Sequence, residues 1–278
     1  MGTLLTRAAF APPELRADYD KYVESYGGQL EYVVGKTTGA RIPVACFRPA
    51  PTFGKPVGVH PGTGSGPGPG PEVTILFSHG NSEDLRMCAK WLRSLADKSR
   101  TRVVAYDYTG YGKFRNSTRP SEASTLSNIV DVYTHVLACY PTTQVVLMGY
   151  SLGSGPSCYL ASLNPVRLGA LVLVAPFASI LSVGLGRHVP GLGHLDMFAN
   201  YCHGRKIMSP TLIVHGERDA LTRPFHAKVL AEAIVGCRGR SVTWVRDGTH
   251  NSILNDLLQE AWVHMRRFLS DHHLVATG

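Results

Sequence analysis

Three side chains whose types can together perform nucleophilic catalysis lie far apart in the chain, and each follows a short apolar run. They are Ser151, Asp219 and His250. A serine hydroxyl is a weak nucleophile at neutral pH, so it needs a base within hydrogen-bond reach and a carboxylate that orients that base. The sequence predicts that Ser151 is the nucleophile, His250 the general base and Asp219 the carboxylate.

The serine is at the centre of the sequence Gly-Tyr-Ser-Leu-Gly at residues 149–153. This spacing is typical of a sharp strand-to-helix turn that lifts the serine oxygen above a sheet, with glycines where a side chain would collide. So short a pattern occurs by chance at roughly 0.2 matches per chain of this length. The apolar run at 145–148 and the helix-length segment after the pattern favour a nucleophile over a purely structural turn.

His250 is chosen from twelve histidines because of its place between the last predicted strand and the last predicted helix. A loop at that point can present a side chain at the ends of the strands. His264 falls inside the predicted helix, and His272 and His273 lie in the tail. These three are interpreted as surface residues.

With Asp219 as the carboxylate, the three residues follow the order Ser, Asp, His along the chain. This order is the one expected when the nucleophile lies at a strand-to-helix turn of a parallel sheet. Glu217 is the alternative carboxylate, and Asp247 is interpreted as a turn or cap residue. The structural alternative for Asp219 is the N-terminal cap of a helix, which needs the same residue type.

An acyl-transfer site also needs N–H donors that face the oxyanion. The amide of Leu152, directly after the nucleophile, is predicted to be the first donor. A loop at 79–81 follows the first buried strand, so we expect the amide of Asn81 to be the second, with Ser82 as the alternative. His79 is expected to brace this loop and not to act as a base.

Alternation of apolar strands and helix-length segments predicts an α/β fold with a mostly parallel sheet and helices on both faces. The predicted buried strands are 73–77, 102–106, 144–148, 170–174, 211–215 and 241–245. The predicted helices are 83–98, 122–139, 152–163, 224–235 and 252–270. Helical character is also present at 13–26, and a strand pair that turns near Thr38-Gly39 is expected at 29–47 as the leading edge strands.

The chain is expected to form one domain, because 278 residues suffice for a single α/β core. Residues 1–48 hold the N-terminal segment and leading edge strands, and the Pro- and Gly-rich residues 49–71 are interpreted as a surface insertion. The core extends over 72–271. Glycines interrupt the pattern within about 179–206, which predicts a small lid, and 272–278 form a tail.

Composition narrows the class of protein. With 44% hydrophobic and 17% charged residues, the chain is expected to be globular. No apolar stretch of about 18 residues and no secretory signal is found, and the six cysteines are scattered, which favours reduced thiols in the cytoplasm. No metal-ligand, dinucleotide or phosphate-loop pattern is complete, so neither a metal nor a cofactor is predicted.

A formal charge of +8 and a pI near 9.3 favour an anionic partner such as the surface of a membrane. The charges are dispersed, and no basic run interleaved with aromatics is present, so nucleic acid is not predicted as a partner. Met1 to Thr6 matches a myristoylation pattern with Gly2 as the acceptor. A single myristoyl group binds membranes only marginally, so the basic surface would have to contribute to membrane binding.

Residues 73–269 resemble the protein depalmitoylases of the α/β-hydrolase-domain-containing protein 17 type, within the α/β-hydrolase superfamily. The matching blocks are Phe77-Ser-His-Gly-Asn81, Tyr106-Asp-Tyr-Thr-Gly-Tyr-Gly112, Pro120-Ser-Glu122, Gly149-Tyr-Ser-Leu-Gly153, Ile213-Val-His-Gly216 with Asp219, and Gly248-Thr-His-Asn251. The resemblance implies the α/β-hydrolase fold and hydrolysis of palmitoyl thioesters on protein cysteines at the cytosolic face of membranes.

The resemblance leaves other substrates open, because several blocks are shared with related lipases and peptidases. A monoacylglycerol lipase, a carboxylesterase or a serine aminopeptidase would use the same three side chains, and a non-catalytic scaffold could keep the fold. That group also carries an N-terminal cysteine cluster for its own acylation, whereas residues 1–45 contain no cysteine. Acylation at Gly2 would have to replace it.

Overall fold

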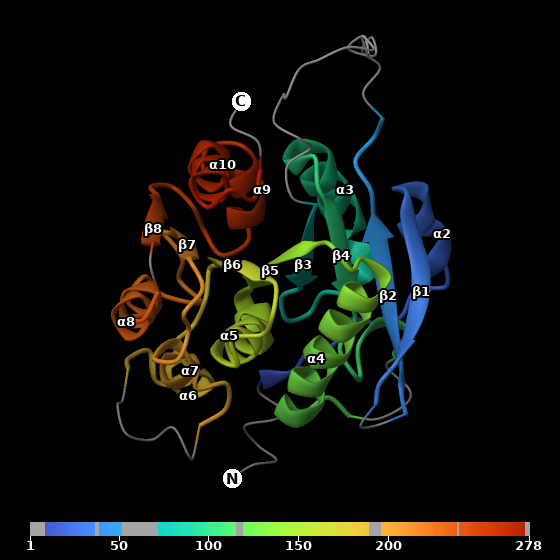
Figure 1. Ribbon diagram of the computed structural model, residues 1–278. Coiled ribbons are helices and arrows are strands. Elements are labelled where there is room, and N and C mark those ends of the chain that lie inside the picture. Colours follow the sequence, from blue (N-terminus) through green and yellow to red (C-terminus); the bar gives the residue numbers. More distant parts are fainter. Residues whose placement is uncertain are drawn as a thin grey trace, which may run out of the picture.

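An eight-stranded sheet runs through the part of the chain that the computed structural model describes, which comprises residues 9–36, 39–51, 72–114, 119–188, 196–237 and 239–275. Its strands lie in the order β1-β2-β4-β3-β5-β6-β7-β8 (Figure 1). Their bounds are β1 Gly28–Val34, β2 Arg41–Phe47, β3 Val73–Ser78, β4 Arg102–Tyr106, β5 Gln144–Tyr150, β6 Leu168–Val174, β7 Thr211–Gly216 and β8 Arg240–Val245.

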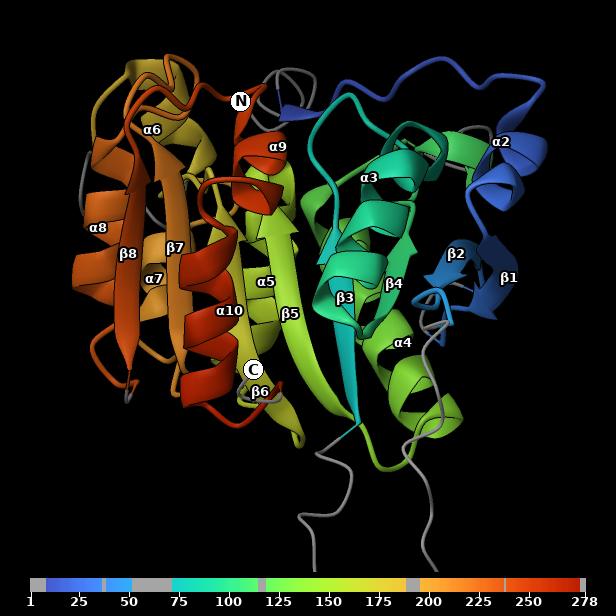
Figure 2. The ribbon, with the colours of Figure 1, turned by 90° about the horizontal axis from the view of Figure 1, so that it is seen from above.

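Strand direction places the ends of most strands together. β1 is antiparallel to β2 and β2 is antiparallel to β4, whereas the other pairings are parallel. The carboxyl ends of β3 to β8 therefore meet at one edge of the sheet, which we call the carboxyl edge (Figure 2). Loops from distant parts of the sequence can converge there.

Helices cover both faces of the sheet, as predicted (Figures 1 and 2). One face carries α2 Tyr19–Ser25, α3 Leu85–Ser99, α9 Ile253–Leu258 and α10 Trp262–Asp271. The other carries α4 Glu122–Cys139, α5 Ser154–Ser162, α7 Asn200–Gly204 and α8 Phe225–Ala233. α6, Ile180–Leu185, lies at the carboxyl edge.

Side chains of each inner strand alternate between two apolar cores. Ile75 and Phe77 of β3 belong to the core under α3, and Leu76 belongs to the core under α4 and α5. Because both faces of the sheet are covered, these strands are apolar at nearly every position.

Caps set the bounds of the longest helices. At the start of α3, the side chain of Asp84 accepts a hydrogen bond from the amide of Met87 (2.9 Å), and Arg100 ends the helix in a left-handed conformation. Ser121 and Ser124 form reciprocal capping bonds at the start of α4. α4 therefore has the bounds that the sequence predicts.

One strand differs from its predicted environment. The strand pair predicted at 29–47 does lie at one edge of the sheet, as β1 and β2, and β2 pairs with β4 on its other side. β8 is predicted to be buried, but it is an edge strand and only Val245 in it is buried. That prediction was wrong because a strand's neighbours depend on contacts between distant segments, which a local apolar pattern does not contain.

Two predicted helices are shorter in the structure. The segment at 252–270 forms α9 and α10 as separate helices, and the ammonium of Lys98 in α3 donates to the carbonyl oxygen of Leu258. In a continuous helix that carbonyl would accept an amide four residues later. The N-terminal helix covers only Tyr19–Ser25, because residues 14–18 are exposed and gain no packing energy from helix formation.

The turn between β5 and α5 is packed against β3 without room for side chains. A Cβ on Gly153 would lie 2.0 Å from the carbonyl oxygen of Ser78, and one on Gly149 would lie 2.4 Å from the carbonyl oxygen of Gly153. Ser151, between the two glycines, has a φ of 49°. The glycines are thus required by close backbone approach.

Asp107, in the loop after β4, is fully buried beneath the N-terminal helix. Its carboxylate accepts hydrogen bonds from the hydroxyl of Tyr19 in α2 and from the amide of Leu85 in α3 (2.9 Å). Burial, aided by the charge of Asp84, raises the pKa of Asp107 to about 7. This carboxyl group therefore titrates near neutral pH in the folded protein.

Replacing Gly153 with alanine should destabilise the fold, because the new Cβ would collide with the backbone of Ser78. Overpacking of this kind costs roughly 1–3 kcal/mol, so we expect the melting temperature followed by circular dichroism to fall by several degrees. Gly184→Ala in α6 is the matched control, since no atom lies within 4 Å of a Cβ there, and its melting temperature should stay level or rise. Equal stability of the two variants would contradict the close packing.

Asp107→Asn should flatten the dependence of stability on pH. The pKa of Asp107 is raised from 3.8 to about 7 on folding, so the stability it contributes is complete below about pH 4 and is lost as the pH rises to about 7. Between pH 5 and 8, the free energy of unfolding of the native protein, measured with urea, should therefore fall more than that of the variant.

Asp18→Asn is the control for this measurement. The hydrogen bond from Arg86 lowers the pKa of the exposed Asp18, so this group is ionised in both the folded and the unfolded protein above pH 5. Between pH 5 and 8, the free energy of unfolding of Asp18→Asn should change with pH as much as that of the native protein. If the free energy of unfolding of Asp107→Asn also changed as much as that of the native protein, burial would not raise the pKa of Asp107.

Candidate active site

Ser151 lies at the carboxyl edge, at the turn between β5 and α5. Its φ of 49° is a left-handed conformation that is rare for a residue with a side chain and is often found at functional sites. Ser154 braces the turn by donating its hydroxyl to the carbonyl oxygen of Ser151 (2.7 Å). The residue is 8% exposed, so its hydroxyl is largely enclosed by protein.

His250 lies between Ser151 and Asp219, in the loop that follows β8. Its Nε2 is 2.9 Å from the hydroxyl oxygen of Ser151, and its Nδ1 is 2.8 Å from Oδ2 of Asp219. A proton on Nδ1 is donated to the carboxylate, which leaves Nε2 to accept the serine proton. The structure thus brings together the three side chains that the sequence singles out.

The loop that carries His250 is fixed by backbone contacts with the loop after β7. A Cβ on Gly216 would lie 2.2 Å from the carbonyl oxygen of Gly248, so glycine is needed there for the two loops to meet. The same carbonyl accepts the amide of Arg218 (3.0 Å). The hydroxyl of Tyr150 donates to the carbonyl oxygen of His250 (2.9 Å), which ties this loop to the residue before Ser151.

Asp219 is buried, and its carboxylate is surrounded by donors. Oδ1 accepts the amides of Leu221 (2.9 Å) and Thr222 (2.8 Å), and Oδ2 lies 2.8 Å from both the hydroxyl of Thr222 and Nδ1 of His250. Burial alone would raise the pKa of Asp219, but the hydrogen bonds from His250 and Thr222 outweigh it, and the pKa lies below its ordinary value. The carboxylate is therefore charged and oriented toward His250.

The alternative residues point elsewhere. Asp247 is exposed and pairs with Arg218 (2.7 Å), and Glu217 is also exposed. His264 is exposed on α10, and the ring of His272 packs against Phe268 at the end of that helix. Among the described residues, none of these side chains forms a hydrogen bond with Ser151, whose hydroxyl lies 2.9 Å from Nε2 of His250.

The loop after β3 lies directly beside the turn that holds Ser151. A Cβ on Gly153 would be 2.0 Å from the carbonyl oxygen of Ser78 and 2.9 Å from that of His79, so the two backbones are in contact. The predicted donors of the oxyanion site, the amides of Leu152 and Asn81, thus come from adjoining segments. Ser82, the alternative donor, is exposed and has a φ of 61°.

His79 is buried within this loop and not directed at the serine. Its Nδ1 lies 2.8 Å from the carbonyl oxygen of Gly80, and its own carbonyl oxygen accepts the hydroxyl of Tyr108 (2.6 Å). Burial lowers the pKa of His79 to about 4, so the ring is neutral at physiological pH. These contacts match the bracing role that the sequence suggests.

Three contributors to the site are not predicted from the sequence. Tyr150 packs its ring 5.5 Å from that of His250, Thr222 holds the carboxylate of Asp219, and Glu83 accepts the amide of Gly80 (2.8 Å). All three carry a weak signal, since each lies within three residues of a predicted site residue. For Glu83 the signal is ambiguous, because a helix start also favours an acidic residue at this position.

Two buried histidines hold segments near Asp219. Nε2 of His215 donates to the carbonyl oxygen of Thr222 (2.6 Å) in the loop that carries Asp219, and Nδ1 of His226 accepts the amide of Ala178 (3.2 Å) in the segment after β6. Burial lowers the pKa of both rings, that of His226 to about 4. Both are therefore neutral hydrogen-bonding groups.

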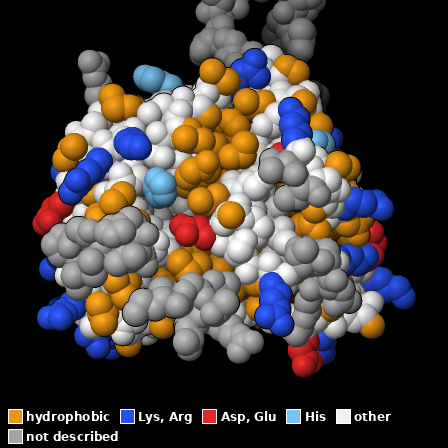
Figure 3. Space-filling model, turned by 90° about the horizontal axis from the view of Figure 1, so that it is seen from below, with side chains coloured by type: hydrophobic (Ala, Val, Ile, Leu, Met, Phe, Trp, Pro, Cys, Tyr) orange, Lys and Arg blue, Asp and Glu red, His pale blue; other side chains and the backbone are white. Residues whose placement is uncertain are grey.

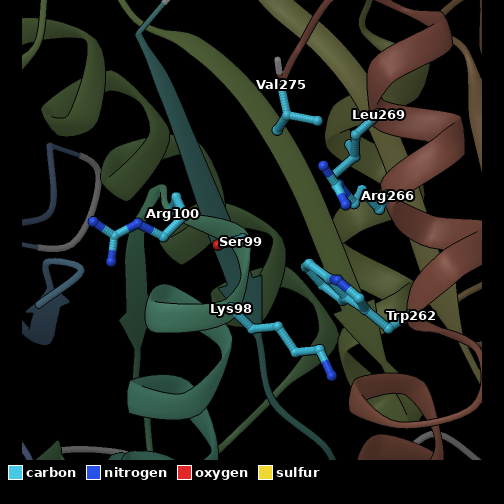
Figure 4. A pocket seen from close by; sticks show the side chains of 7 residues that line it. All are labelled: Lys98, Ser99, Arg100, Trp262, Arg266, Leu269 and Val275. Carbon is cyan, nitrogen blue, oxygen red and sulfur yellow. The ribbon is translucent and has the colours of Figure 1, made fainter. Parts of the chain in front are cut away.

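Two cavities differ in their relation to this site. One of about 310 Å³ lies between α6 and the segment after Asp219, and Leu221 and Arg223 line it. The other, of about 270 Å³, lies at the opposite edge of the sheet, where Trp262 and Arg266 of α10 face Lys98 of α3 (Figure 4). In the described ranges no three His, Cys, Asp or Glu side chains are grouped as metal ligands.

Comparison with known proteins gives a matching family model and several similar relatives. Residues 73–198 match the family model described as alpha/beta hydrolase fold. Alpha/beta hydrolase domain-containing protein 17C of Xenopus tropicalis is 29% identical over 199 residues, which are 71% of this chain and 61% of that protein. The chain thus spans less than two thirds of the length of this relative, and the resemblance stated from the sequence blocks is confirmed.

Solved structures give the same fold at low sequence identity. The esterase Pf2001 of Pyrococcus furiosus superimposes with a TM-score of 0.67 at 13% identity, over 94% of this chain and 98% of the esterase. XC6422 of Xanthomonas campestris, described as an a/b serine hydrolase without lid, gives 0.60 at 20% identity, over 90% and 97% of the two chains. The sheet order, the matching family model and these neighbours together identify the chain as a protein of the α/β-hydrolase fold.

Proposed function

We propose that the protein is a serine hydrolase that cleaves acyl thioesters or esters through an acyl-enzyme, and that it removes palmitoyl groups from protein cysteines. The observation that carries the proposal is the unbroken line of hydrogen bonds from Asp219 through His250 to the hydroxyl of Ser151. The fold and the named relatives support a hydrolase.

In the proposed mechanism, Ser151 attacks the acyl carbonyl carbon while Nε2 of His250 takes the hydroxyl proton. The imidazolium that forms donates Nδ1–H to Asp219, whose charge stabilises it. His250 then gives its proton to the leaving thiolate or alkoxide, which departs as the acyl-enzyme forms. Water, deprotonated by the same imidazole, hydrolyses the acyl-enzyme and releases the acid.

Charge on the carbonyl oxygen has to be stabilised during both steps. We assign this to the amides of Leu152 and Asn81, which lie on segments whose backbones are in contact. All groups in this scheme belong to the protein, so it uses no cofactor.

The proposed substrate rests on the resemblance to the protein 17 type. No contact within the described site indicates it. A monoacylglycerol lipase, a carboxylesterase or a serine aminopeptidase would use the same three side chains, and these are the alternatives. A non-catalytic scaffold is the alternative of another class. The extensive hydrogen bonding of Asp219 and the left-handed φ of Ser151 argue against it, since a scaffold would need neither.

We further propose that the protein works in the cytoplasm at the anionic surface of membranes. Figure 3 shows Lys and Arg side chains around hydrophobic ones on the face that carries α4 and α5, and the chain has a net charge of +8. No helix in the described ranges is long and apolar enough to cross a membrane. Gly2, the predicted acylation site, lies outside the described residues.

Labelling with a fluorophosphonate probe tests the catalytic groups. Ser151→Ala should abolish labelling because the probe reacts with the serine oxygen, and His250→Ala should reduce it strongly because the proton then has no acceptor. Ester turnover should fall by at least ~10⁴ in either variant, since such groups act as a unit. Rates of labelling and turnover are measured on folded protein, checked by circular dichroism.

Ser94→Ala and His264→Ala are the matched controls, because both side chains are exposed on helices away from the carboxyl edge. Each should label and turn over like the native protein. Undiminished labelling of Ser151→Ala or His250→Ala would remove that residue from the mechanism.

A panel of matched substrates tests specificity. A palmitoylated cysteine peptide, a monopalmitoyl glycerol and a palmitoyl-free aminoacyl amide are compared by kcat/KM, each divided by its rate of alkaline hydrolysis to remove intrinsic reactivity. We expect the palmitoyl thioester to have the highest corrected value, and Ser151→Ala supplies the background. A higher value for the glycerol ester or the amide would replace the depalmitoylase proposal by the corresponding alternative.

A further inference from the structure

The first described residues of the chain lie along the carboxyl edge, far in sequence from the loops they contact. Figure 2 shows this segment running beside the ends of the parallel strands before it reaches α2. Ala9 and Phe10 are only 4% and 6% exposed. The segment before α2 is buried in this way only where specific contacts hold it.

Phe10 is held by aromatic side chains from two other segments. Its ring lies 6.5 Å from that of Tyr111, in the loop after β4, and 6.0 Å from that of Phe198, both with edge-to-face geometry. Phe198 in turn packs on the backbone of Gly155 in α5, just after Ser151, where a Cβ would meet its ring at 2.4 Å. Phe10 thus joins the loop after β4 to the region of the predicted lid.

The residue after it, Ala11, is bonded to the proposed oxyanion loop. Its amide donates to the side-chain oxygen of Asn81 (2.9 Å), and the hydroxyl of Tyr111 donates to the same oxygen (2.6 Å). An amide oxygen has two lone pairs, so both are used. On the other side of the loop, the amide of Gly80 is held by Glu83 (2.8 Å).

We propose that Phe10 and Ala11 are positioning residues of the active site, which hold Asn81 so that its backbone amide faces the developing oxyanion. Phe10 anchors the segment, and the amide of Ala11 transmits its position to the Asn81 side chain. Donors in an oxyanion site stabilise charge only if they are fixed before the reaction. This inference rests on the proposed function, because it gives the Asn81 amide that role.

Ala11→Pro tests the inference most directly, because proline removes the amide proton and keeps the Phe10 side chain in the protein. Phe10→Ala would also remove packing and so lower stability for an unrelated reason. The expected effect of Ala11→Pro is a loss of about tenfold in kcat for a p-nitrophenyl ester and in the rate of fluorophosphonate labelling. KM and the melting temperature should stay close to the native values.

Ala17→Pro is the matched control. Residue 17 is exposed and lies second in the turn that the Tyr19 amide closes on the Arg16 carbonyl oxygen (3.2 Å), a position that proline favours. Its kinetics should equal those of the native protein. A similar loss in both variants would assign the effect to a stiffened segment and overturn the inference.

A double-mutant cycle identifies the contact. Asn81→Ala removes the acceptor but keeps the backbone amide, so Ala11→Pro should cause no further loss in that background. An undiminished tenfold loss there would mean that Ala11 does not act through Asn81.

Hydrogen exchange separates this inference from the proposed function. Amides at 79–83 should exchange faster in Ala11→Pro than in the native protein or in Ala17→Pro, whether or not the protein has activity. Unchanged exchange would overturn the positioning role. Faster exchange in a protein that neither labels nor hydrolyses any ester would instead refute the hydrolase proposal and leave the structural coupling intact.

Discussion

The contact between the turn after β5 and the end of β3 is the constraint on which the site depends. Gly153 lies against the carbonyl oxygens of Ser78 and His79 with no space for a side chain. This contact places the backbone after Ser151 beside the loop that carries Asn81. A second contact without side chains, between Gly216 and Gly248, brings the loops of Asp219 and His250 together in the same way. Backbone packing thus sets how far apart the loops lie, and the hydrogen bonds between their side chains form at that separation.

Local patterns in the sequence were sufficient for the strands that carry the site. β3, β5 and β7 are continuous apolar runs because both of their faces are covered, and the residues after them lie at the carboxyl edge as a parallel sheet requires. Ser151 and Asp219, which follow β5 and β7, could therefore be found from residue type and place in the chain. His250 follows β8 and could be found from its place between the last strand and the last helices. Their catalytic roles stay predictions until they are measured.

Features that depend on contacts between distant segments could not be predicted. The edge position of β8 is set by which strand lies next to it. The break between α9 and α10 involves Lys98, some 160 residues earlier in the chain. Nothing near Ala11 in the sequence indicates that its amide meets Asn81, 70 residues later.

Helix α3 joins the two sides of the site. It begins beside the Asn81 loop, and its Trp91 donates to the carbonyl oxygen of Leu254 in α9 (2.9 Å), the helix that follows His250. Lys98 makes the second such bond, to Leu258. The helix therefore acts as a spacer whose length and rotation fix the separation of the two loops. An inserted residue within this helix would rotate the part after it by about 100° and turn one set of contacts away from its partners.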